Sequence, residues 1–287
     1  NKEVMEEIIF HQGDIRDEKF LKKVFLKSLN NGYQIDGVIH FAGLKSVEES
    51  IKKPLIYWEN NVLGTLNLLK ILNLKKCKAF IFSSSATVYG TKNKSPISED
   101  SNTKPINPYG ETNLTIEKIL ESFYKSEETS ISISNLRYFN PIGAHNSFRI
   151  GENPRGIPNN LFPYLCKVAS GQINELKIFG NDWSTRDGTC IRDYIHVMDL
   201  ADGHIKALDH LMTNDSQLIN LNIGTGQGYS VLDLIKTFEN INNVKVPFIF
   251  SDRRKGDVCK LVANNQRAKK ILNWYPKRSI EDMCRDG

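Results

Sequence analysis

The chain of 287 residues lacks any apolar run of the roughly 18 residues that a membrane span requires. Its first residues also lack the basic and then apolar pattern of a secretory signal. The five cysteines are odd in number, widely spread and free of any Cys-x-x-Cys pair, which argues against a disulfide framework and against a zinc site. We therefore predict a cytoplasmic protein with reduced thiols and no bound metal.

The chain also lacks a strong excess of either charge. The formal net charge is +5, and basic residues are interspersed with acidic ones, so a nucleic-acid partner is not indicated. A hydrophobic content of 40% with 25% charged residues is ordinary for a globular domain. Small anionic ligands remain compatible with this mild positive charge.

A glycine-rich loop is missing from the beginning of the chain. A dinucleotide-binding fold begins with a strand, a glycine-rich turn, a helix and a second strand, and none of these precedes Ile8. Since a βαβ unit takes about 30 residues, we expect that roughly 50 residues are absent and that the chain is a fragment. The Gly-x-Gly-x-Gly string at residues 224–228 lies too near the carboxyl end to replace this loop.

Short apolar runs alternate with helical patterns along the chain. This alternation predicts an α/β fold with a doubly wound parallel sheet. We expect strands at residues 8–11, 36–41, 80–85, 131–138 and 221–224, and helices after an Asp17 cap, over 54–74, from 109 onward and from 280. The late strand at 221–224 would return to the first sheet, so the two lobes are expected to be interleaved.

Hydroxyl groups gather where one buried strand ends. Ser83, Ser84 and Ser85 close the apolar run that begins at Phe80, and Tyr109 opens a helix after two prolines. In open α/β sheets the carboxyl ends of the strands face the ligand crevice. A serine at that edge and a tyrosine on the next helix can therefore converge on one substrate atom.

Three motifs carry a resemblance to a known family. They are Ser-Ser-Ser-Ala-Thr-Val-Tyr-Gly at 83–90, Asn-Pro-Tyr-Gly at 107–110 and Val-Ile-His-Phe-Ala-Gly-Leu-Lys at 38–45. Together they resemble the extended short-chain dehydrogenase/reductases, and among these the UDP-glucose 4-epimerase family, over residues 12–282. One position departs: that superfamily has Tyr-x-x-x-Lys, and Asn113 stands in the place of the lysine.

The resemblance implies a Rossmann-type doubly wound sheet with a smaller α/β substrate-binding domain. It implies an NAD-binding domain over 1–141, without its first strands, and a UDP-sugar-binding domain over 142–287, partly interleaved with the first. The implied activity is NAD-dependent 4-epimerisation of a UDP-hexose, UDP-galactose to UDP-glucose, through a transient 4-keto sugar in galactose metabolism. A homodimer through the helices at 54–74 and 109–125 is also implied.

The resemblance assigns roles to individual residues. Tyr109 is the base, Ser85 positions the reacting oxygen, and Asn113 occupies the lysine position. The residues implied to bind NAD are Asp14, Ile15, Phe41, Ala42, Gly43, Lys45, Asn60, Ser83, Tyr109 and Tyr138. Those implied to bind the UDP-sugar are Ser85, Thr87, Asn140, Asn160, Arg192, Arg254, Asp257 and Leu261. The two arginines suit a diphosphate, because guanidinium forks match phosphate oxygens, and a proline-started helix at 156–161 offers an N-terminus to an anion. His196 is expected to be structural.

Asn113 has a predictable consequence for Tyr109. A free tyrosine has a pKa near 10, and bringing it to about 7 takes roughly 4 kcal/mol of differential interaction. An amide carries no charge to supply that energy, so we expect activity to be weak at neutral pH and to rise in alkali, unless Lys45 compensates.

Three other functions have sequence features that favour or disfavour them. A nucleotide-sugar 4,6-dehydratase is disfavoured, because Ala86 and Thr87 stand where elimination needs acidic residues. A 4-epimerase of UDP-N-acetylglucosamine or of a UDP-uronate stays open, since Leu261 leaves room for an acetamido group. Asn113 also leaves open a catalytically weak protein that binds nucleotide sugars.

Overall fold

The computed structural model describes residues 8–126, 129–154, 156, 158–254 and 256–287. Its contacts divide the chain into two compact units. Unit 1 comprises residues 1–90, 103–137 and 204–221, and unit 2 comprises 91–102, 138–203 and 222–287. The segment 204–221, which lies inside the predicted domain 142–287, thus belongs to unit 1, and the chain crosses between the units several times.

Unit 1 is built on a four-stranded sheet in the order β1-β2-β3-β8. The strands are β1 (Gly37–His40), β2 (Ala79–Ser85), β3 (Ser132–Tyr138) and β8 (Leu218–Ile223). β1 and β2 run parallel, with Gly37 opposite Ala79. The strands expected from the apolar runs at 36–41, 80–85 and 131–138 are confirmed, and so is the late strand that returns to this sheet.

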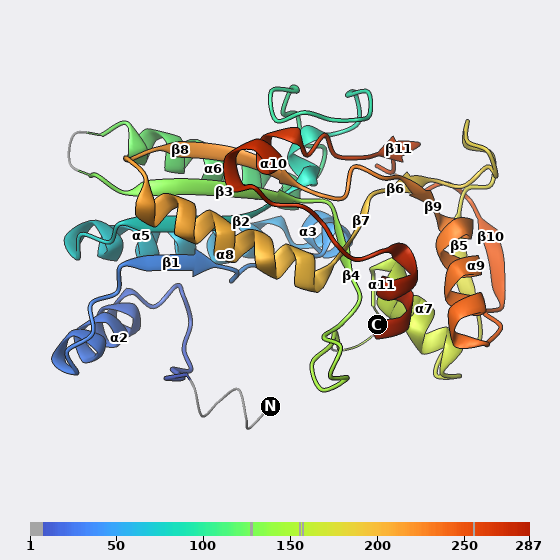
Figure 1. The fold of residues 1–287 in the computed structure, drawn as a ribbon, viewed down its shortest axis with the longest axis horizontal. Helices are drawn as coiled ribbons and strands as arrows, with labels where there is room; N and C mark the ends of the chain where they lie inside the picture. The colour runs from blue at the N-terminus through green and yellow to red at the C-terminus, as the bar shows by residue number, and fades with distance from the viewer. Residues whose placement is uncertain (1–7, 127–128, 155, 157, 255) are drawn as a thin grey trace. The chain divides into compact units, whose positions relative to one another are not determined.

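Helices cover both faces of the sheet in unit 1. α8 (Val197–Thr213) crosses in front of it in Figure 1, and a side chain at Gly37 would come within 2.8 Å of Leu208 on that helix. The opposite face packs against α2 (Glu18–Asn30), α5 (Gly64–Leu74) and α6 (Pro108–Tyr124), through a buried apolar cluster that includes Phe80 and Phe82. This arrangement is the doubly wound α/β fold that the sequence predicts.

The helix expected over residues 54–74 forms with one irregularity. It begins as α4 (Pro54–Tyr57), widens into the π-helical segment η1 (Trp58–Leu63), and continues as α5. π-helical turns are rare and frequently lie at functional sites. The widened turn contains Asn60 and Asn61, which are poor helix formers.

The strand expected at residues 8–11 does not form, and that prediction is wrong. Ile8, Ile9 and Phe10 are 51%, 66% and 61% exposed. An isolated extended segment becomes a strand only when a neighbour takes up its hydrogen bonds, and no described strand pairs with this one. The helix after it does form, and the Asp17 side chain caps α2 by accepting a hydrogen bond from Phe20 N at 3.0 Å, as expected.

Unit 2 has its own apolar core and three small sheets. The core lies among α7 (Leu161–Ala169), α9 (Val231–Asn242) and α11 (Ile280–Asp286). The sheets pair β5 (Leu176–Phe179) with β10 (Phe248–Ser251), β4 (Asn140–Ile142) with β7 (Tyr194–His196), and β6 (Ile191–Arg192) with both β11 (Lys260–Leu261) and β9 (Tyr229–Ser230). The remaining elements are α3 (Val47–Lys52), η2 (Ala86–Tyr89) and α10 (Gln266–Leu272).

Two helix predictions in unit 2 have different outcomes. The last helix, expected from residue 280, is confirmed as α11. The helix expected to start with Pro158 begins instead at Leu161, with Asn160 as its N-cap residue, so the proline lies outside it and that prediction is wrong. Among the described residues, every helix is too short or too polar to traverse a bilayer.

Candidate active site

The structure brings Ser85 and Tyr109 together at one end of the sheet in unit 1. Ser85 is the last residue of β2, and its hydroxyl caps η2 by accepting from Thr87 N at 3.2 Å. Asn107 caps α6 by accepting from Gly110 N at 2.8 Å, which places Tyr109 in the first turn of that helix. The Ser85 side chain is close enough to the Tyr109 phenol to lower its pKa. The two predicted catalytic side chains thus lie close together.

Asn113 lies one helical turn after Tyr109 and is 4% exposed. Its Nδ2 donates to the main-chain oxygen of Tyr109 at 2.9 Å. Burial raises the pKa of Tyr109, and the nearby side chains of Ser85 and Asn113 lower it only in part, so the pKa stays above its ordinary value. Tyr109 therefore needs a further partner, or alkaline conditions, to ionise.

A buried ion pair fixes the elements that carry these side chains. Arg137 on β3 donates to Glu117 on α6, with Nη2 at 2.7 Å and Nε at 3.0 Å from the two carboxylate oxygens. Ser84 donates to the same carboxylate at 2.6 Å, and Arg137 also donates to the Tyr89 hydroxyl at 2.9 Å. The pair therefore ties α6 to β2, β3 and η2 directly behind Ser85.

The loop after β1 carries four of the predicted NAD residues. Phe41, Ala42, Gly43 and Lys45 are all exposed, and the Phe41 ring lies 4.9 Å from the ring of His204. The buried Asn61, which sequence reasoning missed, holds this loop by hydrogen bonds to the backbone of Leu44. The predicted neighbour Asn60 donates to Asn61 Oδ1 at 3.0 Å.

The remaining predicted NAD residues of unit 1 lie at the turn before α2 and at the end of β2. Asp14 accepts from Arg16 Nη2 at 2.7 Å, and this guanidinium lowers the pKa of Asp14 to about 2, so the carboxylate is ionised at neutral pH. Ile15 packs against Gly64, where a side chain would come within 2.4 Å of its Cδ1. Ser83 is half-buried on β2.

In unit 2 the predicted arginines share one carboxylate. Asp257 Oδ1 lies 3.1 Å from Arg254 Nη2 and 3.5 Å from Arg192 Nη2. Leu261 lies opposite Arg192 in the β6–β11 pairing. The Arg254 guanidinium also stands 5.3 Å from the centre of the Phe179 ring. Two guanidinium groups against one carboxylate leave positive charge for an anionic ligand.

Two predicted substrate residues carry buried polar atoms without partners in the described structure, Thr87 Oγ1 and Asn140 Oδ1. Buried polar groups are nearly always hydrogen-bonded, so such atoms fit ligand-binding positions. Asn160 is exposed, and Tyr138 is half-buried at the end of β3.

The buried Asp193 accounts for the glycine string at residues 224–228. Its carboxylate accepts hydrogen bonds from Thr225 N at 2.8 Å, Thr225 Oγ1 at 2.6 Å, Gly226 N at 2.9 Å and Ala263 N at 3.1 Å. Burial raises the pKa of Asp193, and these bonds lower it in part. The loop is therefore structural. His196 is also structural: it is buried, and its Nδ1 accepts from Met198 N at 3.0 Å.

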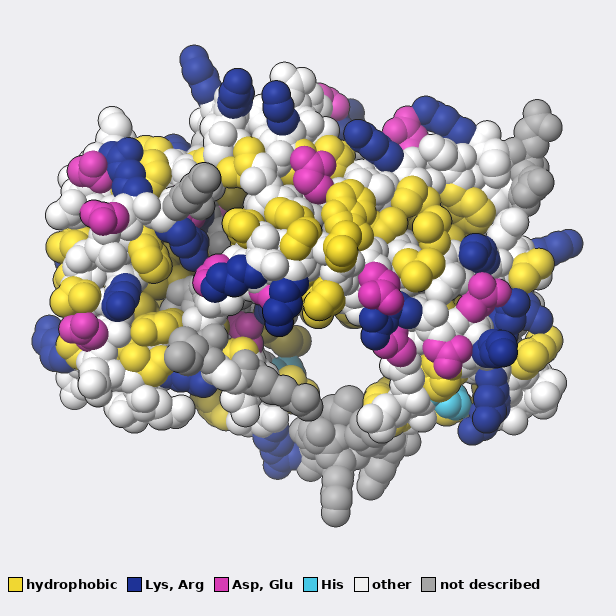
Figure 2. All heavy atoms as spheres, turned by 180° about the vertical axis from the view of Figure 1, so that it is seen from behind, with side chains coloured by type: hydrophobic (Ala, Val, Ile, Leu, Met, Phe, Trp, Pro, Cys, Tyr) yellow, Lys and Arg dark blue, Asp and Glu magenta, His cyan; other side chains and the backbone are white. Residues whose placement is uncertain are grey.

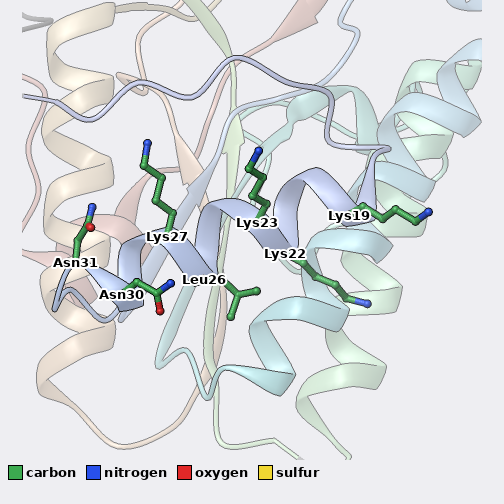
Figure 3. Close-up of a pocket in the computed structure, with 7 residues that line it drawn as sticks. All are labelled: Lys19, Lys22, Lys23, Leu26, Lys27, Asn30 and Asn31. Carbon is green, nitrogen blue, oxygen red and sulfur yellow. The ribbon is translucent and has the colours of Figure 1, made fainter.

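A surface groove of about 620 Å³ runs along α2 (Figure 3). It is lined by Lys19, Lys22, Lys23, Leu26, Lys27, Asn30 and Asn31. α2 and the residue after it, Asn31, supply the whole lining, and none of these residues belongs to the predicted site. Within the described ranges, no group of three His, Cys, Asp or Glu side chains could hold a metal ion.

Comparison with known proteins identifies the relatives of this chain. A family model described as GDP-mannose 4,6 dehydratase matches residues 1–287. The UDP-glucose 4-epimerase of Bacillus subtilis is 47% identical over 281 residues, covering 98% of this chain and 81% of that protein. UDP-glucose 4-epimerase 2 of Arabidopsis thaliana is 48% identical over 277 residues, covering 96% of this chain and 77% of that protein.

Solved structures agree with these sequences. The UDP-glucose 4-epimerase of Stenotrophomonas maltophila, with bound NAD and formylated UDP-arabinopyranose, superposes with a TM-score of 0.92 at 43% identity, covering 97% of this chain and 81% of that one. The UDP-glucose 4-epimerase of Bifidobacterium longum, in complex with NAD+ and UDP, superposes with a TM-score of 0.90 at 45% identity. The match covers 96% of this chain and 80% of that one. The chain belongs to the UDP-glucose 4-epimerase family of the extended short-chain dehydrogenase/reductases.

Proposed function

We propose that this protein is an NAD-dependent 4-epimerase that interconverts UDP-galactose and UDP-glucose. The observation that carries the proposal is the placement of Ser85 close to Tyr109 at the end of β2, in a chain nearly half identical to UDP-glucose 4-epimerases. The five free cysteines fit a cytoplasmic location.

The chemistry follows from the substrate. The hydrogen on a carbinol carbon is not acidic, so inversion requires a transient oxidation. Tyr109, as phenolate, takes the proton of the 4-hydroxyl, while Ser85 hydrogen-bonds to the same oxygen and holds it in place. NAD, when bound, would supply the hydride acceptor that this transient oxidation requires. Asn113 supports the phenolate by a hydrogen bond instead of a charge.

Coenzyme binding is proposed for the exposed 41–45 loop, together with Asp14, Ile15, Asn60, Ser83 and Tyr138. The residues present fit this role, because the loop is open to solvent while Asn61 fixes its backbone. UDP binding is proposed for the arginine pair at Asp257. The unpartnered Thr87 Oγ1 and Asn140 Oδ1, together with Asn160 and Leu261, complete the proposed substrate contacts.

Two related activities differ at identifiable residues. Ala86 and Thr87 supply no carboxylate for the elimination step of a 4,6-dehydratase, although the matching family model bears that description. Leu261 is a medium-sized apolar side chain, which favours UDP-N-acetylglucosamine as a second substrate. A relative from Campylobacter jejuni, named a UDP-Glc/GlcNAc 4-epimerase, is 32% identical with a TM-score of 0.82.

Replacing Tyr109 by phenylalanine tests the proposed function. The change removes only the phenolic oxygen, so we expect kcat for UDP-galactose to fall by about 10²- to 10⁴-fold, the usual contribution of a positioned acid–base group. Affinity for UDP should stay within about twofold, because the arginines of unit 2 are untouched. Turnover is measured by coupled detection of UDP-glucose, and affinity by calorimetry with UDP.

Tyr124→Phe is the matched control. Tyr124 lies at the end of the same helix, its hydroxyl donates to Ser216 O, and it is remote from Ser85. The activity of the Tyr124→Phe variant should equal that of the wild type. A wild-type protein that binds UDP but converts no UDP-galactose between pH 6 and 10 would contradict the proposal.

We also infer a homodimer through the helical run 54–74 and α6. Leu55 and Leu63 are 80% and 41% exposed on this run. Figure 2, which views the molecule from behind, shows hydrophobic side chains gathered at the surface among charged ones. We expect Leu55→Glu to shift the sedimentation coefficient from dimer toward monomer, whereas Leu26→Glu, at an exposed position of α2 outside the inferred interface, should leave it unchanged. Sedimentation of the wild type as a monomer would refute the inference.

A further inference from the structure

Residues 91–102, the strap, belong to unit 2, although they lie between two segments of unit 1 along the chain. Ile97 N donates to Val262 O at 2.8 Å, and Asn264 N donates to Ile97 O at 2.8 Å. Ile97 thus forms a parallel bridge with Ala263, and both residues are only 1% exposed. The strap therefore pairs with the chain at the end of β11 as a neighbouring strand would.

The hydroxyl of Ser95 continues this pairing beside Leu261. Counting back two residues from the bridge places Ser95 opposite Leu261 in the same parallel register. In a regular parallel ladder the backbone N–H and C=O of Ser95 would bond to Lys260 O and Val262 N. The side chain takes both positions: Ser95 Oγ donates to Lys260 O at 3.1 Å and accepts from Val262 N at 3.1 Å. One hydroxyl therefore holds the backbone on both sides of Leu261.

The other edge of β11 is fixed by β6. Leu261 lies opposite Arg192 in that pairing, and Leu261 O accepts from Asp193 N at 3.1 Å. Arg192 Nη1 donates to Val258 O at 2.7 Å, just before β11 begins. Leu261 is therefore held between the backbone of β6 and the strap. The Ser95 hydroxyl is the part of this support that the loss of a single atom removes.

The strap is itself anchored, so it can act as a fixed support. The Glu99 carboxylate is buried and accepts from Asn222 N at 2.8 Å, and it lies 3.8 Å from Arg267 Nε. Asn222 Nδ2 also donates to Ile97 O at 2.8 Å. These contacts join the strap to the end of β8 and to α10, and they do not depend on Ser95.

We propose that Ser95 is a positioning residue that sets the range of sugars the enzyme accepts, because it fixes the place of Leu261. The proposal rests on the function proposed above, in which Leu261 contacts the sugar. The position of that side chain decides how much room a 2-acetamido group has. A difference of one methylene in a pocket changes selectivity by about 10- to 200-fold, so a small shift of Leu261 is enough. In this role Ser95 acts through Leu261 and does not contact the sugar.

The test compares three serine variants of the full-length protein. Ser95→Ala removes both bonds, and Ser95→Thr keeps the hydroxyl. Ser98→Ala is the matched control, because the Ser98 hydroxyl pairs with Ser101 within the strap. The measured quantity is the ratio of kcat/KM for UDP-galactose to that for UDP-N-acetylgalactosamine, its acetamido counterpart.

We expect Ser95→Ala to lower this ratio by about tenfold, since a released Leu261 can withdraw and admit the larger sugar. The change should lie mainly in KM, because Ser85 and Tyr109 are untouched. Hydrogen exchange at the Val262 amide should become faster, since that N–H loses its acceptor. Ser95→Thr and Ser98→Ala should keep the wild-type ratio and the wild-type exchange rate.

A double mutant tests whether the effect passes through Leu261. Leu261→Ala should lower the ratio by itself, and adding Ser95→Ala to it should then change the ratio by less than about twofold. An unchanged ratio in Ser95→Ala, or a full effect of Ser95→Ala in the Leu261→Ala background, would overturn the proposal. A wild type that converts neither sugar would contradict the proposed function instead. The ratio of the two binding affinities, measured by calorimetry, would then decide the role of Ser95.

Discussion

Replacing Asn113 by lysine is expected to raise turnover at pH 7 by about tenfold or more. A cation within 4–6 Å of an acid lowers its pKa by about 1–3 units, and each unit is a tenfold change in the ionised fraction below the pKa. Tyr109 is a neutral acid whose pKa is raised by burial in the present structure. An ammonium group at position 113 favours the phenolate, so the acidic limb of the pH–rate profile moves to lower pH.

The measurement is kcat/KM for UDP-galactose between pH 6 and 10, in the wild type and in the variant. We expect the wild-type rate to climb into the alkaline range, because Tyr109 must lose its proton before it can act as a base. Asn113→Leu, which removes even the hydrogen bond, should move the limb further toward alkali. Ser122→Lys adds the same charge on the exposed side of α6 and should leave the profile unchanged.

The Lys45 ammonium is the one alternative source of charge that the sequence suggests. If it already lowers the pKa of Tyr109 in the complex, the wild type will show a neutral optimum and Asn113→Lys will add little. That result would refute the alkaline prediction and would assign the missing charge to the coenzyme loop. Lys45→Gln would then shift the profile to higher pH, whereas under our prediction it leaves the limb in place.

Breaking the buried ion pair is expected to destabilise the protein by about 3–5 kcal/mol, since removing one partner leaves an uncompensated charge in the interior. Arg137 and Glu117 have side chains only 5% and 6% exposed. Arg137→Met would leave the Glu117 carboxylate with Ser84 as its remaining donor. The free energy of unfolding is measured by denaturant titration of the full-length protein.

Two controls show whether the loss of stability comes from leaving one buried charge without its partner. Replacing both partners by methionine removes both charges and should recover a large part of the loss, because a well-packed apolar pair is often as stable as the ion pair. Glu121→Gln breaks the exposed pair with Lys125 on the same helix and should cost less than about 1 kcal/mol. An Arg137→Met variant no less stable than Glu121→Gln would show that the buried pair contributes nothing.

Much of unit 1 could be predicted because its signals are local. The strand ending at Ser85 is an uninterrupted apolar run, and the helix from Tyr109 has a polar cap and a proline in its first turn. Their convergence follows from the rule that ligands meet the carboxyl ends of parallel strands. These two local patterns were enough to predict that Ser85 and Tyr109 lie close together.

The features that sequence reasoning missed depend on distant partners. Ile8 to Phe10 look like a strand, but pairing decides whether an apolar run is one, and a run carries no information about its neighbour. The partners of Asn61 lie 17 residues away at Leu44 and 51 residues away at Thr112, so the local sequence does not reveal them.

The carboxylate of Asp193 has a consequence for how glycine-rich strings are interpreted. In mononucleotide-binding loops, closely spaced glycines let backbone N–H groups close around a phosphate. Here the loop at 224–228 closes around an anion supplied by its own chain, and the donors at Thr225 and Gly226 are already taken. A glycine-rich string therefore indicates a backbone that can close tightly around negative charge. The charge can be a side-chain carboxylate of the same chain as well as the phosphate of a nucleotide.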